Sequence, residues 1–366
     1  MLYLLYISSA FIALQLFNVL LNFLFRQKIE NTDRQNSCML SVLIPARNEE
    51  ANIGQLLEKL HNMKNEHVEI IVCDDHSEDK TIQIAREYCK KDPRIQLMLS
   101  DTLPTGWLGK NHACFQLAQK ARGNYFLFVD ADVRLHGNIL ADAVSYMKKH
   151  RLGLLSVFPK QIQQTIGEKA SVPIMNYILL TLLPLIFVRV SPFKSHAAAN
   201  GQFMLFDAET YKKFQPHEQF KKSAVEDIEI ARFFKHHKIK TACLTGETRI
   251  ECRMYTSYQE ALNGFSKNIF MFFGNIPVLA FIFWTCAALG FLPFVMPGQQ
   301  LLAEYLIAIV LIQVLYAASC KQPVFYTLLL FPVHLAFMLE MMVKALIVKY
   351  NKKYVWKGRN IYKLHS

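Results

Sequence analysis

The sequence predicts an α/β fold with a doubly wound, mainly parallel sheet, flanked by an N-terminal transmembrane helix and a C-terminal cluster of membrane helices. Three observations lead to this class. Apolar residues make up 52% of the 366 residues and charged residues only 19%, the apolar excess lies at the two ends of the chain, and the middle alternates β-rich runs with amphipathic helices. A chain of this length can bury one large domain and still supply membrane helices.

The first element is an apolar helix. Leu2 to Phe25 contains no charged residue, and roughly 24 helical residues at about 1.5 Å each reach about 36 Å, which exceeds the ~30 Å hydrocarbon core of a bilayer. No basic residue precedes this run and no small-residue cleavage site follows it. We therefore predict an uncleaved transmembrane anchor over residues 1–26.

Short β-rich runs and amphipathic helices alternate from residue 40 onward. The expected strands are residues 41–45, 69–73, 95–99 and 125–129, and the expected helices are residues 53–60, 81–88 and 112–118. Such alternation implies right-handed crossovers and a mainly parallel sheet with helices on both faces. We place this domain at residues 38–275.

Three further apolar runs follow, and we predict membrane helices over residues 276–348. The runs are Pro277 to Met296, Leu301 to Ala318, and Val324 to Val348. Arg26 and Lys28 follow the first helix and place the middle domain in the cytoplasm, since basic residues stay on that side. Three complete spans would then put the basic tail, residues 349–366, outside the cell. One of the three runs is therefore expected to be re-entrant or interfacial.

Residues 172–193 form another strongly apolar stretch, inside the predicted domain. Pro173, Pro184, Pro192 and Arg189 interrupt it, which suits a segment lying in the membrane interface better than a complete span. The alternative is a buried core helix.

The net charge indicates the class of partner, and the cysteine content indicates the redox state of the compartment. A formal charge of +12 suits a surface that contacts anionic lipid head groups or phosphates. Nucleic acid is not an expected partner, because no basic run with interleaved aromatic residues occurs outside the tail. The eight cysteines are scattered without a C-x-x-C pair, as expected in a reducing compartment.

Polar and acidic residues follow the ends of the predicted strands. Asp130 and Asp132 end the fourth strand with one residue between them, so in an extended chain both side chains leave the same side, about 7 Å apart. Asp74 and Asp75 end the second strand, and Glu49 follows the first. Caps of turns would explain any one cluster. Three clusters at one sheet edge indicate a ligand bound with a divalent cation.

The chain contains neither G-x-G-x-x-G nor G-x-x-x-x-G-K-[ST], which argues against a dinucleotide site and a P-loop. Four other motifs occur in order: Val42 to Glu49 (V-L-I-P-A-R-N-E), Ile70 to Asp75 (I-I-V-C-D-D), Gly123 to Asp132 (G-N-Y-F-L-F-V-D-A-D) and Val225 to Glu229 (V-E-D-I-E). In this order they resemble the motifs of inverting glycosyltransferases of family 2 with the GT-A fold.

A narrower resemblance concerns membrane enzymes that glycosylate polyisoprenoid lipids. The stretches G-W-L-G-K-N-H-A from Gly106, A-N-G-Q-F-M-L from Ala199 and W-K-G-R from Trp356 are similar to those of diaponeurosporenoate (carotenoid) and hopanoid-associated glycosyltransferases. The processive motif Q-x-x-R-W is absent, since Met254 and Tyr255 follow Arg253. The resemblance therefore implies addition of a single sugar.

The resemblance also implies roles for individual residues. Asp130 and Asp132 would bind Mg2+ or Mn2+, which in turn would bridge the donor diphosphate. The residues implied to contact the nucleotide sugar are Pro45, Ala46, Arg47, Glu49, Asp74, Asp75, Lys110, Asp130, Asn200 and Gly201. Arg253 and Lys267 are further candidates to neutralise the diphosphate, although contact with lipid head groups would explain them as well.

Glu226 and Asp227 open a predicted amphipathic helix that runs to about His237. Acidic residues are common in a first helical turn, so a purely structural role is the alternative. By resemblance this pair is catalytic, and Asp227 would be the general base that deprotonates the acceptor.

The resemblance implies transfer of one hexose, with UDP-glucose as the expected donor, to a membrane isoprenoid-type lipid such as a carotenoid acid or a hopanoid. The enzyme would be a multi-pass protein of the cell membrane with its catalytic domain facing the cytoplasm. Two alternatives stay open. One is a catalytically silent scaffold or lipid carrier, and the other is a Mg2+-dependent phosphoryl transferase.

Overall fold

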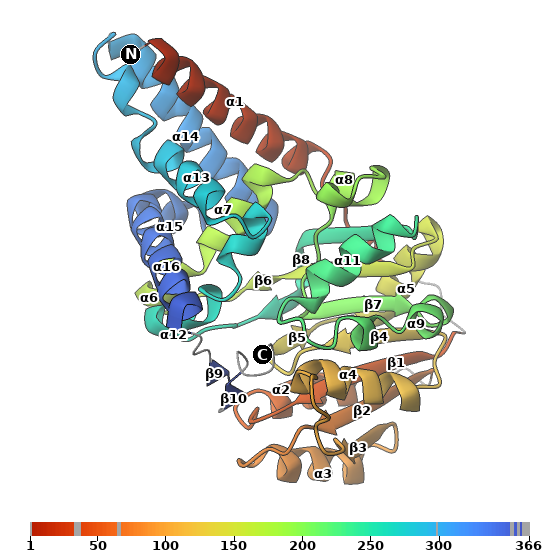
Figure 1. Cartoon of the computed structure of the whole chain (residues 1–366). Coiled ribbons are helices and arrows are strands. Elements are labelled where there is room, and N and C mark those ends of the chain that lie inside the picture. The colour runs from red at the N-terminus through yellow and green to blue at the C-terminus, as the bar shows by residue number, and fades with distance from the viewer. Residues whose placement is uncertain are drawn as a thin grey trace. The chain divides into compact units, whose positions relative to one another are not determined.

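The chain forms two compact units in a computed structural model that describes residues 2–32, 38–63, 67–297, 299–351, 355–356 and 359–360 (Figure 1). The sheet unit comprises Gln27–Lys160, Phe187–Cys252 and Lys353–Ser366. The helical unit comprises Met1–Arg26, Gln161–Ile186 and Arg253–Lys352. Residues 161–186 and 253–275, which we had placed in the central domain, thus group with the apolar helices.

Four parallel strands form one half of the sheet, and they are the four strands that the sequence predicts. Strand β1 is parallel to β2 and β4, and β2 is parallel to β3. Their bounds are Leu40–Ala46 (β1), Val68–Asp74 (β2), Ile95–Leu99 (β3) and Tyr125–Val129 (β4). This half confirms the expected α/β architecture with crossover helices.

The other half of the sheet makes it mixed rather than mainly parallel. Its strands are β5 (Val133–Leu135), β6 (Leu154–Gln161), β7 (Phe203–Asp207) and β8 (Thr241–Cys252), in the overall order β3-β2-β1-β4-β7-β6-β8-β5. Strand β7 is antiparallel to β4 and β6, and β5 is antiparallel to β8. Antiparallel neighbours need no helical crossover, so the β-helix alternation that predicted the first four strands gives no signal for these.

Helices cover both faces of the sheet. Val42 and Ile44 of β1 pack in one apolar core with residues of α2 and α5, whereas Leu43 between them packs in a second core with residues of α4 and α11. The helices of this unit are α2 (Ile53–Asn62), α3 (Thr81–Lys91), α4 (Gly109–Lys120), α5 (Ile139–His150), α9 (Ala208–Phe214), α10 (Pro216–Gln219) and α11 (Glu226–His236). Short helices also occur at Ile186–Val190 (α8) and Lys194–His196 (η1).

The helical unit contains the long apolar helices. Among the described residues, four helices are long and apolar enough to cross a membrane: Leu2–Leu24, Pro277–Phe294, Gln299–Cys320 and Phe331–Tyr350. The elements are α1 (Leu2–Leu24), α6 (Ile166–Ser171), α7 (Pro173–Leu182), α12 (Tyr258–Phe265), η2 (Ile269–Phe273), α13 (Pro277–Leu289), η3 (Leu292–Phe294), α14 (Gln299–Cys320), α15 (Val324–Leu329) and α16 (Phe331–Asn351).

The third apolar run of the sequence is split, because α15 ends at Leu329 and α16 begins at Phe331 with Pro332 in its first turn. In the tail, β9 (Val355–Trp356) pairs with β10 (Arg359–Asn360) in antiparallel orientation. The remaining tail residues, including Lys357 and Gly358 of the W-K-G-R motif, lie outside the described residues.

Helix α7 lies within residues 172–193, for which the sequence predicts an interfacial segment. Most of its side chains are buried inside the helical unit. Polar residues on one side of α1 explain how this helix end is accommodated, since Asn18 Nδ2 donates to the Thr181 carbonyl at 2.7 Å and Asn22 Nδ2 donates to the Leu180 carbonyl at 3.0 Å. These amides satisfy carbonyl groups that the end of a helix leaves without partners. Residues 173–181 thus pack inside the helical unit, and the interfacial position of residues 172–193 stays a prediction.

Arg253 is not placed as the sequence suggested. Within the helical unit its guanidinium lies 2.7 Å from Oε1 of Glu168, a fully buried carboxylate. Glu168 also accepts a hydrogen bond from the backbone nitrogen of Gln164. The arginine neutralises a buried acid of its own unit, which explains it without a diphosphate.

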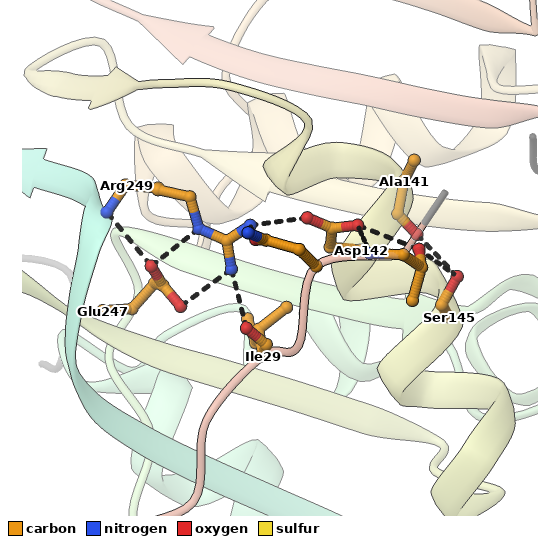
Figure 2. Close-up of polar contacts among 8 residues, drawn as sticks. Ile29, Ala141, Asp142, Ser145, Glu247 and Arg249 are labelled. Atoms are coloured by element: carbon orange, nitrogen blue, oxygen red, sulfur yellow. Dashed lines mark hydrogen bonds and ion pairs between the residues drawn. The ribbon is translucent and has the colours of Figure 1, made fainter. Parts of the chain in front are cut away.

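Arg249 on β8 joins three segments of the sheet unit (Figure 2). It lies 2.5 Å from Oδ2 of Asp142 on α5, donates to the backbone carbonyl of Ile29 at 2.7 Å, and bonds Glu247 through Nε at 2.9 Å. The other carboxylate oxygen of Asp142 accepts from both the backbone nitrogen and the hydroxyl of Thr32, each at 2.9 Å. This network fixes the segment that follows α1 onto α5 and β8.

Replacing Arg249 by leucine is expected to destabilise the sheet unit by about 3 kcal/mol, because it leaves the buried Asp142 carboxylate without its charge partner. Arg249→Lys keeps the positive charge but not the forked geometry of the guanidinium, so it should lose less stability than Arg249→Leu. Thermal unfolding of the purified full chain in detergent measures both variants. Equal melting temperatures for wild type and Arg249→Leu would contradict the assigned role.

Candidate active site

Polar residues collect where β1, β2 and β4 end, as the sequence analysis expected. Ala46, the last residue of β1, is the register partner of Asp74, the last residue of β2. Just beyond, the backbone nitrogen of Asp75 donates to the Ala46 carbonyl at 2.8 Å. Pro45 lies on β1 opposite Cys73 and is half-buried. The first two predicted clusters therefore lie side by side.

The turn after β1 is tied to the turn after β2. Arg47 donates through one guanidinium nitrogen to the carbonyl of Asp75 at 2.5 Å and to that of His76 at 3.2 Å. The backbone nitrogen of Glu49 donates to the Thr81 hydroxyl at 2.8 Å, and its carboxylate accepts from the Asn52 amide at 2.9 Å. In this structure Arg47 thus links the two turns through backbone carbonyls.

Asp74 is fully buried, and its two carboxylate oxygens differ in their environment. Oδ2 accepts from the backbone nitrogen of Ser77 at 2.9 Å, whereas Oδ1 is buried without a hydrogen-bond partner in the described part of the chain. A buried acceptor without a partner is costly. Asp74 Oδ1 therefore has the chemistry to accept a hydrogen bond from a ligand such as a nucleoside.

Lys110, near the start of α4, connects the third cluster to the start of α11. Its ammonium lies 2.8 Å from Oδ1 of Asp130 and 3.8 Å from Oε1 of Glu226. Burial acts to lower the pKa of Lys110, but the negative charges of Asp130 and Glu226 outweigh it and raise that pKa above its usual value. The lysine is therefore a permanent positive charge among carboxylates.

Asp132 has one oxygen held by the protein and one without a partner. Oδ2 accepts from the side-chain amide of Gln202 at 3.2 Å, while Oδ1 is buried and has no hydrogen-bond partner among the described residues. Burial, with the adjacent charge of Asp130 as a second cause, raises the pKa of Asp132 to about 7. A cation beside Oδ1 would offset both the free-energy cost of burying this carboxylate in its ionised form and its repulsion by Asp130.

The donor set suits a hard divalent cation that a substrate helps to bind. No group of three or more His, Cys, Asp or Glu side chains is arranged as a metal cage within the residues that the structure describes. Mg2+ in proteins is held by one or two carboxylates together with substrate phosphates and water. Asp130 and Asp132 fit that pattern, since Oδ1 of Asp132 is buried without a hydrogen-bond partner among the described residues.

Gly201 lies at the centre of the cluster, in the loop before β7. Its backbone nitrogen donates to Oδ2 of Asp227 at 2.9 Å. A β-carbon at this position would lie 3.4 Å from Lys110 Nζ, 3.6 Å from Glu226 Oε1 and 3.7 Å from Asp227 Oδ2. The absence of a side chain therefore keeps open the space that three charged groups share. The Asn200 backbone nitrogen beside it donates to the Ser156 hydroxyl at 2.8 Å.

Glu226 and Asp227 open α11, as the sequence predicts. The helix start is a favourable site for negative charge, but burial raises the pKa of both carboxyls, that of Glu226 to about 7. Lys110 opposes this rise for Glu226, whereas the neighbouring charge of Asp227 adds to it. Asp227 is half-buried and is held by Gly201 and by the backbone nitrogen of Ile228 at 2.8 Å. Its fixed, elevated basicity suits a proton acceptor.

The raised pKa of Glu226 predicts how stability depends on pH. Between about pH 4.5 and pH 7 the folded chain binds more protons at this site than the unfolded chain, so stability falls as the pH rises through this range. Glu226→Gln should therefore raise the melting temperature more at pH 8 than at pH 5, measured in metal-free buffer. Glu58→Gln on the exposed face of α2 is the control, and an equal gain at both pH values for Glu226→Gln would contradict the expectation.

Two residues of the site were missed by the sequence analysis. Gln202 was part of the quoted stretch A-N-G-Q-F-M-L, but only Asn200 and Gly201 were given roles. Cys252 ends β8 and is fully buried, and its sulfur accepts from the Gln202 amide at 2.8 Å. Strand β8 itself was not predicted, so nothing in the sequence pointed to this cysteine.

Comparisons with known proteins agree with the geometry. Residues 41–213 match the model of the family described as glycosyl transferase family 2. The chain is 28% identical over 248 residues to the 4,4'-diaponeurosporenoate glycosyltransferase of Staphylococcus haemolyticus, a match that covers 67% of this chain and 64% of that protein. It is 30% identical over 241 residues to the enzyme of the same name from Staphylococcus aureus, covering 64% and 61%. The chain thus spans less than two thirds of the length of these relatives.

A solved structure shares the fold. The mannosyltransferase PcManGT from Pyrobaculum calidifontis, in complex with GDP-Man and Mn2+, has a TM-score of 0.57 at 16% sequence identity, over 94% of this chain and 99% of that one. This confirms the predicted GT-A-type sheet. The family model thus matches residues 41–213, just under half of the chain, and the solved structure shows a shared fold.

Proposed function

We propose that this protein transfers one sugar from a nucleotide sugar to an isoprenoid-type lipid acceptor, with inversion at the anomeric carbon. The proposal rests on the convergence of Lys110, Glu226 and Asp227 around Gly201, with Asp130 paired to the same lysine. This convergence brings groups that could neutralise a diphosphate, such as Lys110, close to a group that could accept a proton, Asp227. A displacement that expels a diphosphate needs both.

On the leaving-group side, Asp130 and Asp132 would hold Mg2+ or Mn2+, which when bound supplies positive charge to the diphosphate. The ammonium of Lys110 adds a second positive charge, because its raised pKa keeps it protonated. Asp74, with its partnerless buried oxygen, would accept a hydrogen bond from the nucleoside. Pro45, Ala46, Arg47, Glu49 and Asp75 would form the wall of that pocket.

On the acceptor side, Asp227 would take the proton of an attacking hydroxyl. The backbone nitrogen of Gly201 and that of Ile228 each donate to one of its oxygens, so the carboxylate is oriented before the acceptor binds. Glu226, one residue earlier, would remain beside Lys110 and modulate the electrostatic potential around the lysine ammonium. Asn200 and Gly201 would shape the sugar pocket through close backbone approach.

A carotenoid acid is the acceptor class that we propose, since both relatives are named for diaponeurosporenoate. A hopanoid is the alternative acceptor. For the donor we propose UDP-glucose, as the sequence analysis expected. The solved mannosyltransferase carries GDP-Man, so both nucleotide classes belong in a test.

We further propose that the four long apolar helices anchor the chain in the cell membrane, with the sheet unit in the cytoplasm. Arg26 and Lys28 after α1 support this orientation. The basic tail is expected on the same side, which requires that one of the three C-terminal apolar helices be re-entrant or interfacial rather than a complete span. A reporter fused after Ser366 tests the topology, and an external reporter signal would contradict it.

Mass spectrometry of lipid extracts tests the function directly. Cells that express the wild-type chain together with a carotenoid-acid pathway should accumulate a lipid heavier by one hexose, and cells that express Asp132→Asn should not. Purified protein incubated with UDP- and GDP-sugars in turn identifies the donor by the nucleoside diphosphate released. Release of inorganic phosphate instead would favour phosphoryl transfer, and unchanged lipids with wild type would favour a silent scaffold.

A further inference from the structure

We propose that Gln202, together with Cys252, forms a brace for the D-A-D segment, Asp130 to Asp132. The brace positions the two acids of this segment for a divalent cation. The inference rests on the proposed function, because it assigns a cation to Asp130 and Asp132. It adds two positioning residues to which the sequence analysis gave no role.

Gln202 contacts both ends of the D-A-D segment. Its backbone carbonyl accepts from the backbone nitrogen of Asp130 at 3.2 Å, and its side-chain amide donates to Oδ2 of Asp132 at 3.2 Å. The contact arises because β4 and β7 are antiparallel with Val129 opposite Phe203, which places Gln202 directly across from the segment. One residue therefore fixes the separation of the two acids.

Cys252 completes the brace from β8. Its sulfur accepts from Nε2 of Gln202 at 2.8 Å, the same amide nitrogen that donates to Oδ2 of Asp132. Register pairs Cys252 with Val133, the residue after Asp132. Gln202 is 4% exposed and Cys252 fully buried, so water does not compete for these contacts.

The brace acts on one oxygen of Asp132 and leaves the other available. Oδ2 receives the amide and Oδ1 has no partner in the described chain. A carboxylate held in this way cannot rotate freely. A cation that binds Oδ1 therefore does not have to restrict the rotation of the Asp132 side chain. Outer-shell hydrogen bonds of this kind typically change metal affinity by roughly 10- to 100-fold when removed.

A purely structural role makes a different prediction. A buried glutamine whose amide is satisfied by two neighbours contributes to folding wherever it occurs, and its loss would lower stability without changing cation affinity. Affinity for the ion, and not stability or activity alone, therefore separates the two interpretations.

The experiment titrates Mn2+ into the purified full chain, with and without UDP, and follows free Mn2+ by electron paramagnetic resonance. Gln202→Met, which keeps side-chain length but removes the amide, is expected to weaken Mn2+ binding by about 10- to 100-fold. Cys252→Ala should weaken it less, and Cys252→Ser, which retains a hydroxyl for the same contacts, should restore most of the affinity. Gln313→Leu, which removes another fully buried glutamine on α14, should leave it unchanged.

Mn2+ affinities within twofold of wild type in both Gln202→Met and Cys252→Ala would overturn the brace. Should Gln202→Met fail to fold, the difference between Cys252→Ala and Cys252→Ser decides. Asp132→Asn distinguishes the two levels of the argument. If that variant loses Mn2+ while Gln202→Met and Cys252→Ala bind it normally, the brace fails and the proposed function stands. If Asp132→Asn also binds normally, the cation site itself is wrong.

Discussion

Asp132→Asn is expected to lower the rate of sugar transfer by roughly 1,000-fold, about 4 kcal/mol of transition-state stabilisation. The substitution removes the charge of a carboxylate whose Oδ1 is buried without a protein partner and which, with Asp130, would hold the cation. Because asparagine keeps the shape, the contact with Gln202 has a counterpart and the fold should persist. Initial rates of nucleoside diphosphate release with saturating donor measure the effect.

Two controls make that result specific. Glu58→Gln removes an acid from the exposed face of α2 and should leave the rate unchanged. Raising the Mn2+ concentration should recover part of the activity of Asp132→Asn, because the remaining carboxylate Asp130 can still bind the ion weakly. A variant that retains wild-type activity at micromolar Mn2+ would refute the assignment of Asp132 to the cation.

Asp227→Asn is expected to have a second large effect that depends on the acceptor. With an alcohol acceptor the rate should fall by roughly 100- to 10,000-fold, the usual contribution of a general base. A carboxylic acid acceptor is already ionised near pH 7 and needs little help in losing a proton, so its rate should fall much less. Parallel assays with a carotenoid acid and with an isoprenoid alcohol give the two ratios.

The fixed position of Asp227 makes this comparison informative. Asparagine can still accept from Gly201 through its side-chain oxygen, the contact that Oδ2 of Asp227 makes at 2.9 Å, so the change removes basicity more than structure. Equal and complete loss with both acceptors would show that Asp227 has a role other than taking a proton. Gly201→Ala offers a steric contrast, since its β-carbon would lie within 3.4 to 3.7 Å of the three charged groups and should impair both acceptors alike.

Local pattern was enough to predict the half of the fold that holds the nucleotide side of the site. Strands such as β1 and β4 are short apolar runs that end in polar residues, and the helices between them have one apolar face, so their type and order follow from residues close in the chain. The same logic placed Asp74 and Asp130 at a common sheet edge, since parallel strands present their carboxyl ends together.

Strand β8 and the packing of helix α7 show what local pattern does not specify. Thr241 to Cys252 carries charged residues in a long edge-region strand, and its pairing with β5 depends on a partner more than 100 residues away. The apolar stretch around α7 looked interfacial because its proline residues interrupt it, yet Asn18 and Asn22 of α1 supply the hydrogen bonds that its end requires. No local feature of either stretch specifies its partner.

By itself, the sequence determined the α/β class, the four parallel strands, the apolar helices at both ends and the identity of the acids at the strand ends. Only the tertiary structure decided that Lys110 lies between Asp130 and Glu226 and that Gly201 lies against Asp227. It also decided that Arg253 pairs with Glu168, and that Gln202 bonds the backbone of Asp130 and the carboxylate of Asp132. The physical reason is range. Backbone conformation and amphipathic pattern are set by neighbours in the chain, whereas charge pairing and burial depend on which distant segments the packed core brings within a few ångströms.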